Sequence, residues 1–532
     1  MQINMEPRAA EFCQNIARKP MYWLPLLILT FAAFGFDLFN RNPVADDTLR
    51  DFYNEAMLHS RWGMVLWNAL FGVMDYSPFI DKFIALVFLI LAGLGLSFIL
   101  YEISDSRNVV GYSLFACSFI TFPLINEIWN YGGANFYSTG GLLLCILSII
   151  VLNNKETSFI KKNIIASLLL VLPVSSYESS VFSYLTIICA IDFYLVLSKK
   201  VRYSIKSWLN NIIRYVIPLI IAVFIRIAVS IILYFIFDIN YFTTGDVSIS
   251  WLQKGLVSSL IFMVGSDIYL YFVSALVYFP ITEFAIAFII LFTISFAKTI
   301  KEHSMQPIML CIVLILAVFS LSLLRGTGLA YRTAQTVSVF VAFAFFITYD
   351  YVLKEKSSIV KSIATTILFF VCIHQSTYLN KIQSLNNHIY VNEIAVIHNL
   401  AQRIKSNYAE KPIVFVSGYS MGSWIKSKTY ADSTTWNGKL FYDICSLVPS
   451  IGSHDFAKYP RLNVRVLNQF PEIPERIFEY CGYNIKTISK RSVLEEATRI
   501  AKSHKMRSYE IYDNGSYLIV QLSGEYYFVD NL

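Results

Sequence analysis

Two adjacent carboxylates near the start of the chain are the first candidates for chemistry. Asp46 and Asp47 follow shortly after the first long apolar run, residues 22–39. Two neighbouring acids can take different roles, in which one is ionised as a general base and the other orients a group or binds a cation. Such a pair is also common in solvated loops, and Asp47 followed by Thr48 and Leu49 can simply begin a helix. The pair alone leaves catalysis and helix capping both open.

Further polar and aromatic residues occur in segments that we expect on the same face of the molecule. They comprise an arginine, two aromatic residues and two acids: Arg61, Trp62, Glu127, Tyr177 and Glu178. Aromatic rings together with carboxylate and amide groups suit the ring and hydroxyls of a sugar. Each acid by itself is equally well explained as a solvated loop residue. The combination favours a polar site at one face.

A later loop carries two arginines and no acid. It runs from Leu324 to Arg332 and contains Arg325 and Arg332. Guanidinium groups pair bidentately with phosphate, so this loop is a candidate site for an anionic group. The other explanation is that both side chains snorkel from helix ends towards water.

The elements that must position these residues are long apolar helices. Hydrophobic residues make up 56% of the 532 residues and charged residues only 15%. A bilayer core about 30 Å thick needs roughly 20 apolar residues per helix, and apolar runs of this length recur from residue 22 to about 379. We therefore predict a polytopic α-helical membrane domain, residues 1–379, with about eleven transmembrane helices. A small soluble α/β domain, residues 380–532, is expected to follow.

The charges in the loops orient this domain. The basic loops are 104–108, 153–162, 199–206, 298–303 and 354–361, whereas the alternating loops 126–135, 175–179 and 238–255 contain one lysine between them. Basic loops usually face the cytoplasm. We expect a multi-pass protein of the bacterial inner membrane with a cytoplasmic N-terminus and a periplasmic C-terminal domain. The apolar residues 251–275 must then form an interfacial or re-entrant helix.

The C-terminal tail contains a motif that is easily misread. Ser417–Gly422 includes Gly-x-Ser-x-Gly, the pattern of a hydrolase nucleophile elbow. A hydrolase needs several strands before that elbow, but residues 400–405 read as a helix and residues 411–417 as the first strand. We therefore favour a strand-to-loop turn in a small α/β domain.

Cofactors and partners are only partly indicated. No spacing of cysteine, histidine or acidic residues predicts a metal site, although a divalent cation at the acid pair stays open. The net charge of +7 lies largely in the loops between helices, so it does not indicate nucleic acid. The lipid bilayer is the expected partner.

These features together resemble the Gtr-type serotype-converting glucosyltransferases, bacterial and phage-encoded enzymes of the GT-C fold class. The resemblance rests on a basic N-terminus, one helix, an outer loop with Asp46-Asp47, Arg61-Trp62-Gly63, and Tyr177-Glu178-Ser179 at the outer start of a later helix. It implies a donor sugar linked to undecaprenyl phosphate and an O-antigen acceptor. The run Phe39–Pro43 departs from the commonest family form and leaves the donor sugar open.

The same resemblance implies an inverting displacement. Either Asp46 or Asp47 acts as the general base, with Glu178 a further catalytic candidate. The substrate- and phosphate-binding candidates are Arg61, Trp62, Glu127, Tyr177, Arg325 and Arg332. The alternative is a transporter or flippase of a lipid-linked saccharide. Transporters bind near the membrane midplane between structural repeats, whereas here the polar residues gather at one face and no repeat is visible.

Overall fold

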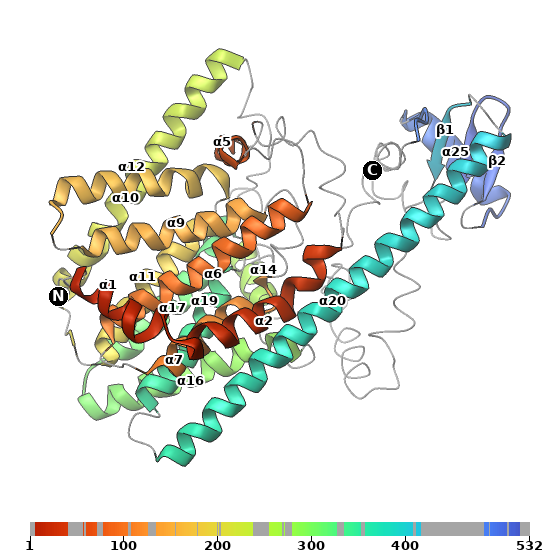
Figure 1. The fold of residues 1–532 in the computed structure, drawn as a ribbon. Coiled ribbons are helices and arrows are strands. Elements are labelled where there is room, and N and C mark those ends of the chain that lie inside the picture. Colours follow the sequence, from red (N-terminus) through yellow and green to blue (C-terminus); the bar gives the residue numbers. More distant parts are fainter. Residues whose placement is uncertain are drawn as a thin grey trace. The chain divides into compact units, whose positions relative to one another are not determined.

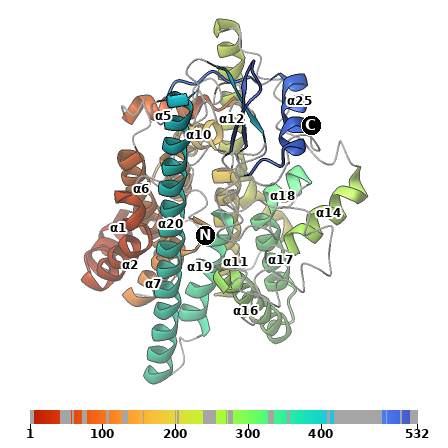
Figure 2. The same cartoon turned by 90° about the vertical axis from the view of Figure 1, so that its right-hand side faces the viewer.

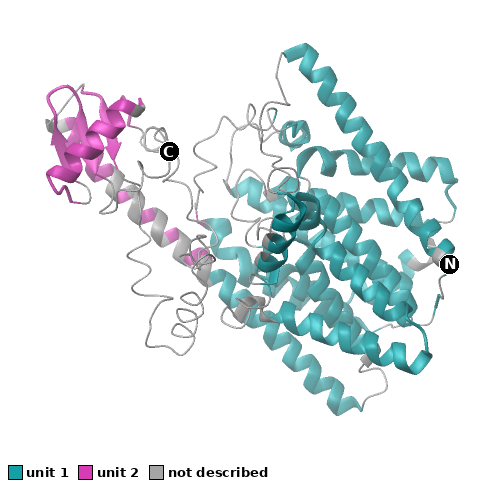
Figure 3. Cartoon of the chain, turned by 180° about the vertical axis from the view of Figure 1, so that it is seen from behind, with its two compact units in different colours: residues 1–39, 52–382 teal, residues 40–51, 383–532 magenta. Residues whose placement is uncertain are grey.

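The computed structural model describes most of the chain (Figure 1). The described residues are 6–40, 57, 60–71, 78–104, 108–125, 135–154, 156–177, 179–198, 200–201, 204–237, 255–268, 271, 279–326, 335–352, 357–407, 411–416, 483–488, 490–507 and 510–521. The chain forms two compact units (Figure 3). Unit 1 comprises Met1–Phe39 and Phe52–Ile382, and unit 2 comprises Asn40–Asp51 and Gln383–Leu532.

Unit 1 is built from helices. Among the described residues, eight helices are long and apolar enough to cross a membrane. They are α2 (Pro20–Phe39), α6 (Pro78–Ile103), α9 (Asn135–Asn153), α10 (Phe159–Ser176), α11 (Ser179–Leu197), α12 (Ile205–Phe237), α16 (Phe279–Glu302) and α20 (Ser358–Asn407). Figure 2 shows α20 as one continuous helix.

Shorter elements complete unit 1. They are α1 (Glu6–Phe12), η1 (Cys13–Ala17), α5 (Trp62–Phe71), α7 (Val109–Thr121), α14 (Leu256–Ile268), α17 (Gln306–Val318), α18 (Ser320–Arg325), α19 (Gln335–Ile347) and η5 (Thr348–Val352). Helices α7, α14, α17 and α19 have 13 residues each. At 1.5 Å per residue, each covers only about 20 Å of a hydrocarbon core about 30 Å thick. The total of about eleven spanning helices therefore stays a prediction.

The interior of unit 1 surrounds α19. All thirteen residues of α19 are buried, and the helix packs against α7, α11 and α16. Helix α12 is the opposite case, because it presents large apolar side chains outwards. Phe224, Ile232 and Phe235 are 67%, 55% and 78% exposed. Soluble proteins rarely expose contiguous apolar surface of this extent, so these side chains face lipid in a membrane protein.

Local signals in the sequence set the helix ends. The side chain of Asn108 accepts a hydrogen bond from the Val110 N–H at the start of α7, at 3.0 Å. Ser158 caps α10 in the same way through the Lys161 N–H. Such side chains satisfy backbone donors that lack a partner in the first helical turn. Both caps lie in loops that the alternation of apolar and basic segments predicts.

Unit 2 contains a small three-stranded sheet. Its strands are β1 (Ile413–Val416), β2 (Ile511–Asp513) and β3 (Leu518–Gln521), in the order β1-β3-β2. Strand β1 pairs parallel to β3, with Ile413 opposite Leu518, and β2 pairs antiparallel to β3.

Helices cover both faces of this sheet. The end of α20 packs on one face through Leu400 and Ile404, and α25 (Arg491–Ser503) packs on the other through Leu494 and Ala497. The predicted order of helix then strand is correct, since residues 400–405 lie in α20 and β1 follows. The Gly-x-Ser-x-Gly segment lies outside the described residues.

Candidate active site

Four of the nine predicted site residues fall in the described part of the chain: Arg61, Trp62, Tyr177 and Arg325. The remaining five, Asp46, Asp47, Glu127, Glu178 and Arg332, lie outside it. The described part of the site therefore consists of binding residues, and the roles of the acids remain predictions.

Arg61 and Tyr177 lie together although 116 positions separate them in sequence. Arg61 immediately precedes α5, and Tyr177 is the residue that ends α10. The guanidinium carbon of Arg61 lies 5.7 Å from the centroid of the Tyr177 ring. That distance is within the range of a cation–π interaction, in which the negative face of the ring attracts the cation. Two separate sequence motifs thus meet at one place.

The close approach of α5 to α10 depends on Gly63. A Cβ atom at this position would lie 2.6 Å from Ser176 Oγ and 2.9 Å from the carbonyl carbon of Ser175. Real Cβ contacts are essentially never this short. The glycine of the Arg-Trp-Gly motif is therefore required for α5 to lie against the end of α10 (Figure 1). We call this region, with its neighbouring helix ends, the Arg61 end of unit 1.

Arg325 is the last residue of α18 and is partly exposed. Gly326 ends the helix in the left-handed conformation, with φ of 69°, and its N–H donates to the Ser322 carbonyl at 2.8 Å. The Ser322 hydroxyl in turn donates to Asp267 of α14 at 2.6 Å. Within the described ranges, the side chain of Arg325 forms no hydrogen bond or ion pair with another residue.

A buried ion pair links the helices that flank the predicted acid loop. Lys82 of α6 lies 2.5 Å from the carboxylate of Asp37 in α2, and the two side chains are 2% and 1% exposed. Sequence reasoning missed this pair. The signal was available, because a charged residue inside an otherwise apolar run is costly unless it is paired.

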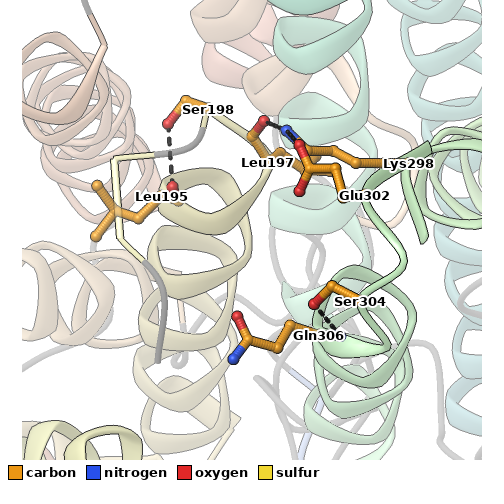
Figure 4. Close-up of polar contacts among 7 residues, drawn as sticks. All are labelled: Leu195, Leu197, Ser198, Lys298, Glu302, Ser304 and Gln306. Carbon is orange, nitrogen blue, oxygen red and sulfur yellow. Dashed lines mark hydrogen bonds and ion pairs between the residues drawn. The ribbon is translucent and has the colours of Figure 1, made fainter. Parts of the chain in front are cut away.

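At the opposite end of unit 1, which we call the Lys298 end, polar contacts join the ends of neighbouring helices. Lys298 donates to the Leu197 carbonyl and lies 3.5 Å from Glu302 (Figure 4). Its ammonium nitrogen also lies 5.2 Å from the centroid of the Tyr351 ring. The residues flanking the loops predicted as cytoplasmic therefore contact one another here. Which side of the membrane this end faces stays a prediction.

The Lys298 end continues through Asp350. This carboxylate accepts hydrogen bonds from Ser104 at 3.2 Å and from the Tyr194 hydroxyl. Asn108 donates to the Tyr349 hydroxyl at 2.9 Å. These contacts satisfy their groups within the protein, whereas the Arg61 end carries the candidate binding residues.

No group of three or more His, Cys, Asp and Glu side chains that could hold a metal ion occurs among the described residues. Asp46 and Asp47 lie outside that part of the chain. A divalent cation at the acid pair therefore stays open.

Comparison with protein families decides the class of the molecule. A family model described as glucosyl transferase GtrII matches residues 35–349, more than half of the chain. The chain belongs to the GtrII glucosyl transferase family. No curated protein matches the chain. The matched residues include Asp37, Arg61, Tyr177 and Arg325, so the GtrII region carries the Arg61 end. The expected resemblance is confirmed, and the protein is a membrane glycosyltransferase.

Proposed function

We propose that this GtrII-family protein transfers a sugar, glucose in the first instance, from undecaprenyl phosphate to O-antigen or a related surface glycan. The proposed place of transfer is the periplasmic face of the bacterial inner membrane. The family match over residues 35–349 carries the proposal, and the meeting of Arg61 with Tyr177 within that region supports it.

The proposed reaction is a direct displacement. Asp46 or Asp47 takes the proton from an acceptor hydroxyl while that oxygen attacks the anomeric carbon of the donor sugar. The bond from this carbon to the phosphate oxygen breaks, and the polyprenyl phosphate leaves with the electron pair. The anomeric centre is inverted. If neither aspartate is the base, Glu178 is the next candidate.

The departing phosphate needs positive charge nearby, because preorganised cations stabilise charge that develops in the transition state. Arg325 is suited to this role because it is partly exposed and makes no ion pair with any described residue. Arg332, in the same loop of the sequence, and Arg61 are the proposed additional cations. A guanidinium group matches a phosphate in geometry better than an ammonium group does.

The alternative function, transport of a lipid-linked saccharide, is less well supported. Membership of a glucosyl transferase family favours group transfer. The helices at the Lys298 end are also joined by buried contacts, such as the hydrogen bond from Lys298 to Leu197. A transporter would have to break these contacts in each cycle. Transfer from a membrane-bound donor needs access at one end only.

The proposal is tested with purified protein and a panel of polyprenyl-phosphate sugars. Transfer to O-antigen is measured for the wild type, for Arg325→Gln and for Lys206→Gln. Lys206 is an exposed residue at the start of α12 and serves as a charge-matched control. Because a hydrogen bond to a charged group contributes about 1.5–3 kcal/mol, Arg325→Gln should lower kcat/KM for the donor about 10- to 150-fold. Lys206→Gln should behave as the wild type.

Two results would count against the proposal. A wild-type protein that transfers no sugar from any polyprenyl phosphate would contradict the donor class. An unchanged kcat/KM for the donor in Arg325→Gln would remove that residue from the phosphate site and reduce it to a snorkelling side chain.

A further inference from the structure

Three helices begin at one point near the Arg61 end. Gln335, the first residue of α19, donates from its amide to the hydroxyl of Ser138 in the first turn of α9. Ser180, the second residue of α11, donates to the Ser138 carbonyl at 3.4 Å. We name Ser138, Ser180 and Gln335 the Ser138 junction. The first N–H groups of every helix lack partners within the helix, so the junction brings together donors from three helices.

Buried polar atoms without partners occur on Gln335 of the junction and on the chain that joins α10 to α11 just before Ser180. The amide oxygen of Gln335 and the hydroxyls of Ser176 and Ser179 have no hydrogen-bond partner among the described residues. These side chains are 2%, 0% and 2% exposed. Native proteins keep few such atoms, because an unsatisfied buried group costs about 1–3 kcal/mol. Several of them on adjoining helix ends indicate a bound group that supplies the missing partners.

Helix α5 adds indole groups to the same region. The indole N–H groups of Trp62 and Trp67 are also buried without a partner in the described part of the chain. A Cβ atom at Gly140 of α9 would lie 3.0 Å from the Trp67 ring, and Gly63 of α5 lies against Ser176. Helix α5 therefore lies across the start of α9 and the end of α10, beside the junction.

We propose that the Ser138 junction is a subsite for a hexopyranosyl ring; this rests on the proposed function. The unpartnered groups are neutral and include both donors and acceptors. The amide oxygen of Gln335 accepts a hydroxyl hydrogen but would repel a phosphate oxygen. The serine hydroxyls can do either, and the indole ring of Trp62 suits the apolar face of a sugar. The Trp67 ring packs against Phe71, Phe88 and Phe136, so it offers only its N–H. The sugar ring can belong to the donor or to the acceptor glycan.

Removing an unpartnered hydroxyl separates a binding role from a structural one. Ser179→Ala deletes a group that makes no hydrogen bond within the described protein, so thermal stability should stay equal or rise. If Ser179 binds a sugar hydroxyl, the same variant should raise the KM for that substrate about two- to tenfold. Ser259→Ala is the matched control, since Ser259 on α14 is equally buried and unpartnered among described residues. It should leave both KM values unchanged.

Gln335→Met tests the amide with substrates of defined structure. Transfer is compared for polyprenyl-phosphate glucose and its analogues lacking one hydroxyl at ring position 2, 3, 4 or 6. In the wild type, loss of the hydroxyl that Gln335 contacts should lower kcat/KM about tenfold or more. In Gln335→Met the same deletion should cost little. The same series on the acceptor sugar distinguishes the two sources of the ring.

A rise in the donor KM assigns the junction to the donor sugar, and a rise in the acceptor KM assigns it to the acceptor; both support the subsite. Unchanged KM values for both substrates in Ser179→Ala and Gln335→Met would overturn it. If the wild type uses no polyprenyl-phosphate sugar, the proposed function fails, and the junction is tested by saturation-transfer NMR with methyl β-glucoside. Saturable binding weakened by Ser179→Ala then supports the subsite, and absent or unaltered binding overturns it.

Discussion

Replacing Gly63 by alanine should damage transfer more than it damages the fold. The new Cβ atom would lie 2.9 Å from the Ser175 carbonyl carbon, a backbone atom that cannot rotate away. Ordinary contacts begin at 3.4 Å, so α5 and the end of α10 must separate by about half an ångström. The nearby hydroxyl of Ser176, at 2.6 Å, must move as well.

The size of each effect follows from this geometry. Overpacking of this kind costs about 1–3 kcal/mol, and the better helix propensity of alanine offsets up to about 1 kcal/mol. The net loss of stability should be about 0–3 kcal/mol. Misplacing binding groups by about 1 Å can cost about 100-fold in rate. Because Arg61 lies two residues before Gly63, directly in front of α5, we expect kcat/KM to fall at least about tenfold.

Transfer kinetics and thermal unfolding of the purified protein in detergent measure the two effects. Gly265→Ala is the control, because a Cβ atom on Gly265 of α14 meets nothing within 4 Å. It should be as stable as the wild type, or more stable by up to about 1 kcal/mol, and fully active. A Gly63→Ala protein with wild-type kinetics and stability would show that α5 does not pack on Ser175 as described.

Three other outcomes are expected. Asp46→Asn or Asp47→Asn should lower the transfer rate about 10²–10⁴-fold in a protein that still inserts, and near-normal rates in both variants would move the base to Glu178 or Glu127. Lys82→Met removes the buried cation that neutralises the Asp37 carboxylate and should cost about 3–5 kcal/mol in thermal unfolding, whereas Asp37→Leu with Lys82→Met should recover most of it; a stable single variant would contradict the ion pair. A reporter fused after Leu532 that works only in the cytoplasm should stay silent, and a signal from it would reverse the proposed topology.

Hydropathy predicted the placement of several helices. The expected helix at 79–101 appears as α6, and the loops expected at 104–108 and 153–162 coincide with the breaks before α7 and α10. Apolar runs of bilayer length leave few other solutions. The length of α12, 33 residues, could not be predicted, because composition does not reveal how far a lipid-facing helix extends.

The contacts of the candidate site could be predicted only in part. Arg61 and Tyr177 were expected on one face, but their direct approach depends on Gly63 meeting Ser175 and Ser176. Small residues allow such contacts without producing any periodic pattern in the sequence.

The Ser138 junction was missed for a similar reason. Ser138 and Gln335 are ordinary polar residues at helix starts, and only the tertiary structure brings them together. The ion pair of Asp37 with Lys82 is different, since both charged residues stand within apolar runs of the sequence. Their pairing could have been predicted from the cost of an unpaired charge in the membrane.

The most direct test of the central claim uses the wild-type protein in liposomes with labelled undecaprenyl-phosphate glucose and an O-antigen acceptor. NMR of the product reads both the transfer and the configuration of the new glycosidic bond. The account predicts label in the acceptor with an inverted anomeric centre, and loss of that label in one of the variants Asp46→Asn and Asp47→Asn. Label that enters the acceptor only from a nucleotide sugar, or with a retained anomeric centre, would contradict it.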